Sequence, residues 1–255
     1  MEIKFTGFDP GRDAEELADV YAAVFAGPPW NEVTRCPVMP GRFFGSQTQP
    51  GQDCPDCLVA SQPKRTPLEV AYPKQEMVEY FAEETTKDGS LALIGRPNSG
   101  PDQGRIVAFT WMYNYPDVKD FVKDKYQVTR GDVTGLRFQV RLIQLLEQQG
   151  IAGKFGYFSE SGILPDYRGN GLSNEFWTRR WDWARSQGIP ALQRTRWDSP
   201  MTIAARKIGF EQLLGPRSEP FISPDGTRGI RQTGQVVNGL IDQINQDRVL
   251  FRSPR

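Results

Sequence analysis

The sequence predicts a mixed α/β fold built around one central unit of strand, loop and helix. Three observations support this prediction. Alternating apolar residues open the chain and return between residues 91 and 113, which is typical of strands. Apolar residues at helical spacing fill residues 12–26 and 172–186. A loop with glycines, residues 165–171, joins the strand-like residues 154–164 to the second of these helices.

The first part of the chain is expected to hold a strand, two helices and a hairpin. Residues 2–8 alternate as a strand, and residues 12–26 form a helix that a glycine and two prolines end. A second helix is predicted over residues 74–87. Residues 91–95 and 105–113 then read as two strands of a hairpin, joined by a turn-forming segment.

Two further stretches are expected to be insertions into this fold. Residues 30–72 are rich in Pro, Gly, Gln and Cys without periodicity, so we expect a loop-dominated segment. Residues 115–150 form the second insertion, and a helix is predicted over residues 135–150, where four apolar side chains can share a face. With these insertions, residues 1–255 are expected to form one domain.

The last part of the chain continues with strand and helix signals. Residues 190–197 read as a strand, and Ser199 followed by Pro200 is a typical helix start. The chain from Phe210 is strand-like and contains a hairpin signal. Residues 236–249 are predicted to be helical.

Composition excludes several classes of protein. The chain is 38% hydrophobic and has no apolar run near the roughly 18 residues of a membrane span. Its start lacks the basic and apolar regions of a secretory signal, so we expect a cytoplasmic protein. Lys plus Arg and Asp plus Glu each number 31, so no net charge favours nucleic acid or an anionic bilayer.

Histidine is absent from the chain, which excludes Ser-His-Asp and Cys-His nucleophilic sites and every metal site that contains His. A general base must then be a carboxylate, Tyr, Lys, Cys or water. The chain also holds 3 Cys residues, an odd number that indicates reduced thiols or a metal-site remnant instead of a disulfide framework.

The cysteines lie in two short segments that resemble the knuckles of a zinc ribbon. Cys54 and Cys57 have the spacing of one knuckle, and Cys36 begins another in which Met39 stands where a second cysteine is expected. A thioether is a poor ligand for zinc, although Asp53 or Asp56 could complete a site. The sequence favours a degenerate knuckle held by local packing over bound zinc, and a zinc content would reverse that preference.

The loop before residues 172–186 has the composition of an anion site. Gly169 and Gly171 leave backbone N–H groups bare at the start of a helix, where the helix dipole favours negative charge. The third glycine of the dinucleotide fingerprint is missing, and no Gly-Lys-Ser/Thr follows for a P-loop. The alternative is that the two glycines only shape a tight turn from strand to helix.

The same segment resembles motif A of the GNAT superfamily of N-acetyltransferases, Gln/Arg-x-x-Gly-x-Gly/Ala after an apolar residue and a proline. Ser173 replaces the last small residue of the motif. Upstream, Glu160 stands where relatives have Glu-Leu-x-Val-x-Pro; downstream, "KIGFEQL" resembles the end of motif B, and "VFAGPPWNE" the family's first helix and loop. The residues that fill motif A and its approach are Ile163, Leu164, Pro165, Arg168, Gly171 and Ser173.

The resemblance implies a mostly antiparallel sheet flanked by helices and splayed at one strand, where acetyl-CoA enters. It also implies that the loop backbone holds the pyrophosphate of acetyl-CoA, that Arg168 adds positive charge there, and that main chain near Ile163 pairs with the pantetheine arm and polarises the thioester carbonyl. The implied cofactor-binding residues are Ile163, Leu164, Arg168, Gly169, Asn170, Gly171, Leu172 and Ser173.

The base that would deprotonate an acceptor amine is expected to be a carboxylate. Glu160 is the first candidate, because alternation places it on the same strand face as Phe158 and Gly162; a solvent-facing or ion-paired strand glutamate is the alternative. Asp198 is a weaker candidate that could instead cap the next helix. Where many relatives carry a tyrosine that protonates the leaving thiolate, this chain has Ala205, so the general acid is unassigned.

Two functions from different classes follow. The first is an acetyl-CoA-dependent N-acetyltransferase that acts on an amine of a small molecule or peptide by direct attack. The second is a CoA-binding or zinc-ribbon-like adaptor that has lost catalysis, which the alanine at position 205 and the incomplete knuckle would suit. We expect the first, with acetyl-CoA as cosubstrate and neither nucleic acid nor membrane as a partner.

Overall fold

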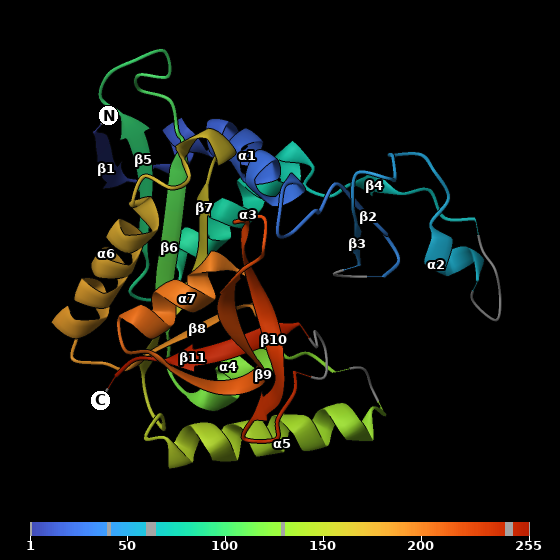
Figure 1. Ribbon diagram of the computed structural model, residues 1–255, viewed down its shortest axis with the longest axis vertical. Helices are drawn as coiled ribbons and strands as arrows, with labels where there is room; N and C mark the ends of the chain where they lie inside the picture. Colours follow the sequence, from blue (N-terminus) through green and yellow to red (C-terminus); the bar gives the residue numbers. More distant parts are fainter. Residues whose placement is uncertain (1, 40–41, 60–64, 129–130, 243–246, 255) are drawn as a thin grey trace. The chain divides into compact units, whose positions relative to one another are not determined.

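The computed structural model describes residues 2–39, 42–59, 65–128, 131–242 and 247–254 (Figure 1). Helices flank a large sheet whose hydrogen-bonded strand order is β1-β5-β6-β7-β8-β11-β9-β10. Where the register is defined, the neighbouring strands run antiparallel except for β7 and β8, which are parallel. The predicted mixed α/β fold with a mostly antiparallel sheet is therefore confirmed. No helix among the described residues has the length and apolar character needed to cross a bilayer.

The chain divides into two compact units, each assembled from separate stretches. Strands β6 (Ala108–Tyr115) and β7 (Phe155–Ile163) contribute residues to both units. That residues 1–255 act as one domain stays a prediction. The first unit comprises Met1–Thr86, Leu91–Thr110 and Ser161–Asn170, and the second Lys87–Ser90, Trp111–Glu160 and Gly171–Arg255.

The first unit pairs strand β1 (Ile3–Gly7) with strand β5 (Leu91–Pro97) and packs helix α1 (Pro10–Ala26) against helix α3 (Lys74–Thr86). All four elements lie close to the bounds that their apolar periods predict. Asp9 caps α1 by accepting a hydrogen bond from a backbone N–H of the first turn, as turn residues at a helix start commonly do.

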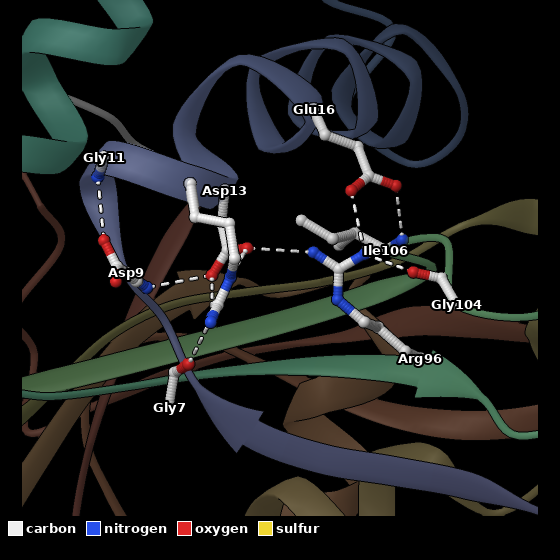
Figure 2. A network of polar contacts seen from close by, with 9 residues as sticks. Gly7, Asp9, Gly11, Asp13, Glu16, Arg96, Gly104 and Ile106 are labelled. Carbon is white, nitrogen blue, oxygen red and sulfur yellow. Dashed lines mark hydrogen bonds and ion pairs between the residues drawn. The ribbon is translucent and has the colours of Figure 1, made fainter.

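A polar network ties α1 to β5 and to the chain before β6 (Figure 2). Asp13 is fully buried and accepts hydrogen bonds from Arg12 at 2.7 Å and from Arg96 at 3.0 Å. Glu16 accepts from Arg96 at 2.9 Å and from the backbone N–H of Ile106 at 2.6 Å. Burial of an unpaired carboxylate costs free energy, so these hydrogen bonds allow the charged Asp13 to be buried.

The cysteine-containing insertion is more ordered than its sequence predicts. Strands β2 (Thr34–Arg35), β3 (Phe43–Phe44) and β4 (Glu69–Val70) form a small antiparallel sheet with β2 in the centre, and helix α2 (Pro55–Leu58) carries one of the knuckles. Strands of two residues are too short to show a period of two, which is why the sequence indicated only loop.

The second unit contains the remaining strands of the large sheet. Strand β8 (Ala191–Arg196) pairs with β11 (Arg248–Arg252), which pairs in turn with β9 (Glu211–Ile222). Strand β10 (Arg228–Val237) forms a long hairpin with β9 at the predicted turn (Figure 1). All three pairings are antiparallel.

The helices of the second unit occupy the segments that apolar spacing favoured. Helix α4 (Val118–Lys125) packs against α5 (Val133–Gln148) in the predicted insertion 115–150, although only α5 was expected there. Helix α6 (Leu172–Ser186) matches its predicted bounds and packs against α7 (Pro200–Lys207).

The prediction of a helix over residues 236–249 is wrong where the structure describes it. Residues 236 and 237 end β10, and residues 248–252 form β11; residues 243–246 lie outside the described part of the chain. Val249, Leu250 and Phe251 are completely buried. They form a central strand because β8 and β9 both offer open edges to it, a demand of tertiary pairing that local periodicity does not carry.

Candidate active site

The two parallel strands at the centre of the sheet separate after a short stretch of pairing. Strand β7 pairs with β8 at three positions, the last being Phe158 opposite Gln193. Strand β8 continues to Arg196 and pairs along its other edge with β11 from Leu192 onward, and β7 continues to Ile163. Among the described residues, nothing in β7 beyond Phe158 pairs with β8. The splayed strand that the sequence resemblance implies stays a prediction.

The end of β7 leads into a loop held by two anchors. The backbone N–H of Leu164 donates to the carbonyl of Val107, and a single 3-10 turn (η1, Pro165–Tyr167) follows. The buried Tyr167 donates its hydroxyl proton to Asp102 at 2.6 Å. These contacts fix the chain on the β7 side of the glycines.

Arg168 has contacts that differ from its implied role. Its Nε donates to the carbonyl of Ile163 at 3.1 Å, and its Nη1 donates to the carbonyl of Pro28 at 3.0 Å. Partial burial lowers the pKa of the guanidinium, which remains a cation at neutral pH. The Arg168 side chain thus links the end of β7 to the turn after α1 through hydrogen bonds. The N–H groups that make neither bond could donate to an anion.

The glycines that follow adopt backbone conformations that other residues avoid. Gly169 and Gly171 both have φ of 81°, and nothing lies within 4 Å of a Cβ built on either. Gly171 is the N-cap of α6 and offers no side chain to satisfy the first N–H groups. In the described chain, the five backbone N–H groups from Gly169 to Ser173 donate to no other residue. They are therefore suited to an anionic ligand.

Glu160 lies beside a buried arginine that sequence reasoning did not single out. Its carbonyl accepts a hydrogen bond from Arg180 of α6, while its side chain is half-buried. Arg180 is fully buried, with its guanidinium 5.5 Å from the centre of the Phe158 ring. Burial lowers the pKa of Arg180 to about 9, and the charges of Tyr157 and Glu160 act in the opposite direction. The position of Arg180 on the apolar face of α6 is the signal that could have identified it.

The alternation that groups Glu160 with Phe158 and Gly162 stays a prediction. Phe158 contacts Trp177 of α6, with ring centres 5.9 Å apart. A Cβ on Gly162 would lie against the ring of Phe109 of β6 and 2.9 Å from Val24 of α1. The two residues that alternation groups with Glu160 thus contact different elements.

Asp198 has an ion-pair partner instead of a cap. Its two carboxylate oxygens accept from Nε and Nη2 of Arg196 at 2.9 Å and 3.0 Å. The α7 cap is provided by Ser199, whose hydroxyl accepts from the N–H of Met201 at 3.2 Å. The capping alternative for Asp198 is therefore wrong. Ala205 is completely buried in α7, and its methyl side chain has no ionisable proton to donate.

The three cysteines of the two knuckles come together in the structure. The Sγ atoms of Cys36, Cys54 and Cys57 all lie within 4.8 Å of one another, and all three residues are buried. The carboxylates that the sequence offered for a fourth ligand are engaged elsewhere: Asp56 pairs with Arg42, and Asp53 lies 3.8 Å from Arg65.

Comparison with solved structures places this fold among the N-acetyltransferases. Over 100% of both chains, the structure is similar to the polyamine N-acetyltransferase of Drosophila melanogaster, an enzyme that forms N-acetylagmatine, with a TM-score of 0.50 and 12% identity. It is similar over 99% of both chains to mosquito arylalkylamine N-acetyltransferase like 5b (TM-score 0.51, 10% identity) and to arylalkylamine N-acetyltransferase 2 of Aedes aegypti (TM-score 0.50, 10% identity).

The chain therefore shares the fold of these N-acetyltransferases, which is the fold that the resemblance in its sequence implies. No protein-family model and no curated protein sequence matches it. At these identities, the comparison shows the fold alone.

Proposed function

We propose that this protein is an acetyl-CoA-dependent N-acetyltransferase that transfers the acetyl group to an amine of a small molecule or peptide. The observation that carries the proposal is the separation of β7 from β8 after Phe158, followed by a loop whose backbone N–H groups have no partner in the described chain. A strand edge and an anion-binding helix start, joined in this order, suit a ligand with an extended arm and a diphosphate.

In this proposal, the backbone of Gly169 to Ser173 binds the pyrophosphate of acetyl-CoA. Each hydrogen bond to a charged phosphate would contribute about 1.5–3 kcal/mol, and the start of α6 adds a favourable dipole. Arg168 contributes its positive charge from the position where it braces Ile163. The β7 main chain near Ile163 pairs with the pantetheine arm and polarises the thioester carbonyl, whereas the N–H of Leu164 donates to the carbonyl of Val107.

The chemistry is direct attack by the acceptor amine on the thioester carbon. The amine is mostly protonated at neutral pH, so it must first give a proton to a base, for which we propose the carboxylate of Glu160. A carbon–nitrogen bond then forms and the carbon–sulfur bond breaks, releasing CoA thiolate. Thiols ionise near pH 8.5 in water, so this leaving group departs without an acid at position 205.

A binding experiment and a turnover experiment together test the proposal. Calorimetry of the full chain with acetyl-CoA should show saturable binding at tens of micromolar protein, which is an ordinary concentration for this method. A thiol-release assay over a broad panel of amines should then show turnover with at least one of them. Absence of acetyl-CoA binding would reject the acetyltransferase function.

The second candidate function is a CoA-binding adaptor without catalysis. The buried Ala205 favours it, since relatives use a tyrosine there as general acid. It predicts acetyl-CoA binding by calorimetry but no thiol release with any amine. The same pair of measurements therefore distinguishes the two candidates.

A further inference from the structure

The cysteine segment brings three thiols to one buried point. Cys36 follows strand β2, Cys54 is the N-cap of α2, and Cys57 lies within that helix. The backbone N–H of Cys54 donates to the carbonyl of Thr66 at 2.8 Å, which anchors this knuckle to the chain leading into β4. The residues that meet here are thus held by strand pairing and by backbone hydrogen bonds, independently of any bond between the sulfurs.

The spacing of the sulfurs suits coordination of one metal ion. The Sγ atoms of Cys36 and Cys57 are 3.7 Å apart, and Cys54 Sγ lies within 4.8 Å of both. Four sulfurs around a zinc ion at a bond length of about 2.3 Å would be about 3.8 Å apart in a tetrahedron. The three sulfurs therefore need to move little to take three corners of a tetrahedron around one zinc ion.

The surroundings of the sulfurs are buried and mostly apolar. The exposed fractions of Cys36, Cys54 and Cys57 are 3%, 0% and 8%. Leu68 completes the buried cluster, and Met39 and Phe44 pack against it. Among the described residues, no carboxylate joins this group of ligand atoms. The three cysteine sulfurs are thus the ligand atoms of the cluster, and such soft donors select thiophilic metal ions.

We propose that Cys36, Cys54 and Cys57 form a metal site that binds one thiophilic d¹⁰ ion of the zinc class and fastens the two knuckles of the insertion. Binding is not a redox step: each thiol that coordinates releases one proton to solvent, and the ion gains one sulfur ligand for each proton released. This site is separate from the proposed acetyl-CoA loop, and the proposal does not depend on the acetyltransferase function.

The test uses the full chain, purified under reducing conditions without chelator. Elemental analysis should give about one zinc per chain. After removal of the metal, titration with cobalt(II) should produce the intense sulfur-to-cobalt charge-transfer absorption of thiolate coordination, and one equivalent of zinc should abolish it. Cys57→Ser should lose most of the charge-transfer intensity, while far-UV circular dichroism and denaturant unfolding report whether the chain is still folded.

A pair of substitutions at Met39 makes the test sharper. Met39→Cys restores a second thiolate in the first knuckle and should raise the apparent zinc affinity by about tenfold or more, because zinc prefers four thiolates to three. Met39→Leu keeps the apolar packing without a thiolate and should leave the stoichiometry at one. A higher zinc affinity in the Met39→Cys chain and not in the Met39→Leu chain supports the site, because only the cysteine adds a metal ligand.

Several outcomes would overturn the proposal. Zinc below a tenth of an equivalent, together with no charge-transfer absorption in cobalt(II), would mean that the three thiols only pack together. A disulfide between Cys36 and Cys57, found by mass spectrometry of protein kept from added oxidant, would have the same consequence. If the Met39→Cys chain binds zinc no more tightly than the Met39→Leu chain, the cluster is not the site.

Discussion

At the scale of the residue, the proposed chemistry depends on Glu160. Its carbonyl is held by the buried Arg180, so the backbone that carries the carboxylate is fixed from the α6 side. Asp198 is occupied by a two-point ion pair with Arg196, which makes it the poorer base. A base must reach the proton that it removes in addition to having a suitable pKa. The strand that carries Glu160 is the one that runs into the loop proposed to bind acetyl-CoA.

Replacement of Glu160 tests this assignment. Glu160→Gln keeps the size of the side chain but cannot accept the amine proton, so the turnover number in the thiol-release assay should fall by roughly 100-fold or more. Acetyl-CoA affinity should stay the same. Glu219→Gln, which changes an exposed carboxylate on β9, is the matched control and should leave the turnover number unchanged. Undiminished turnover in the Glu160→Gln chain, or an equal loss in Asp198→Asn, would move the base elsewhere.

At the scale of the element, the start of α6 joins a loop with two left-handed glycines to a helix. Both glycines of this loop lie in the left-handed region, which costs other residues about 1–2 kcal/mol. The motif resemblance predicts the glycines, but the tertiary structure shows what they do. Their conformation leaves the N–H groups of the loop and of the first turn without partners in the described chain. A side chain at either position would change this arrangement of donors.

Two glycine substitutions separate backbone strain from ligand binding. Gly171→Ala and Gly226→Ala both introduce a Cβ at φ above 80°, where nothing lies within 4 Å. Each should lower the free energy of unfolding by about 1–2 kcal/mol, measured by denaturant unfolding. Only Gly171→Ala should also weaken acetyl-CoA binding, because it alone reorients the donors of the loop. Equal acetyl-CoA affinities in the two variants would show that the loop is not the pyrophosphate site.

At the scale of the whole molecule, stability should depend on pH through a buried carboxylate. Burial raises the pKa of Asp13, but hydrogen bonds from Arg12 and from the Asp9 backbone, with the charge of Arg96, hold the pKa below its usual value. A carboxyl group whose pKa is lower in the folded state stabilises that state above its unfolded pKa of about 3.9. This stabilisation is lost as the pH falls through the lower folded value.

Replacement of Asp13 should therefore have a large effect at neutral pH and a smaller one in acid. Asp13→Asn should lower the free energy of unfolding by about 2–4 kcal/mol at pH 7, because it leaves two arginines without their shared partner. Asp19→Asn, which removes an exposed ion pair with Lys74, should cost less than about 1 kcal/mol. Denaturant unfolding at pH 7 and pH 3 measures both. A difference between wild type and Asp13→Asn that does not shrink at pH 3 would contradict the assigned pKa shift.

The sequence by itself determined the elements whose apolar period is long, and it placed two glycines in the loop before α6. The bounds of α1, α3, α6 and β8 follow from local periodicity and caps, and the motif at the start of α6 predicted the GNAT fold that comparison confirms. Local signals are enough to predict these segments, because buried positions recur along each of them with the period of a helix or a strand.

Only the tertiary structure decided the features that depend on pairing between distant segments. The last strand, β11, forms because β8 and β9 provide its hydrogen bonds, and the same residues read locally as a helix. Contacts between different segments of the chain also decide three other features. These are the end of the β7–β8 pairing, the burial of Arg180 against Phe158 and the cluster of three cysteines. Residue types and spacings in one segment carry no information about which other segment will supply the partner.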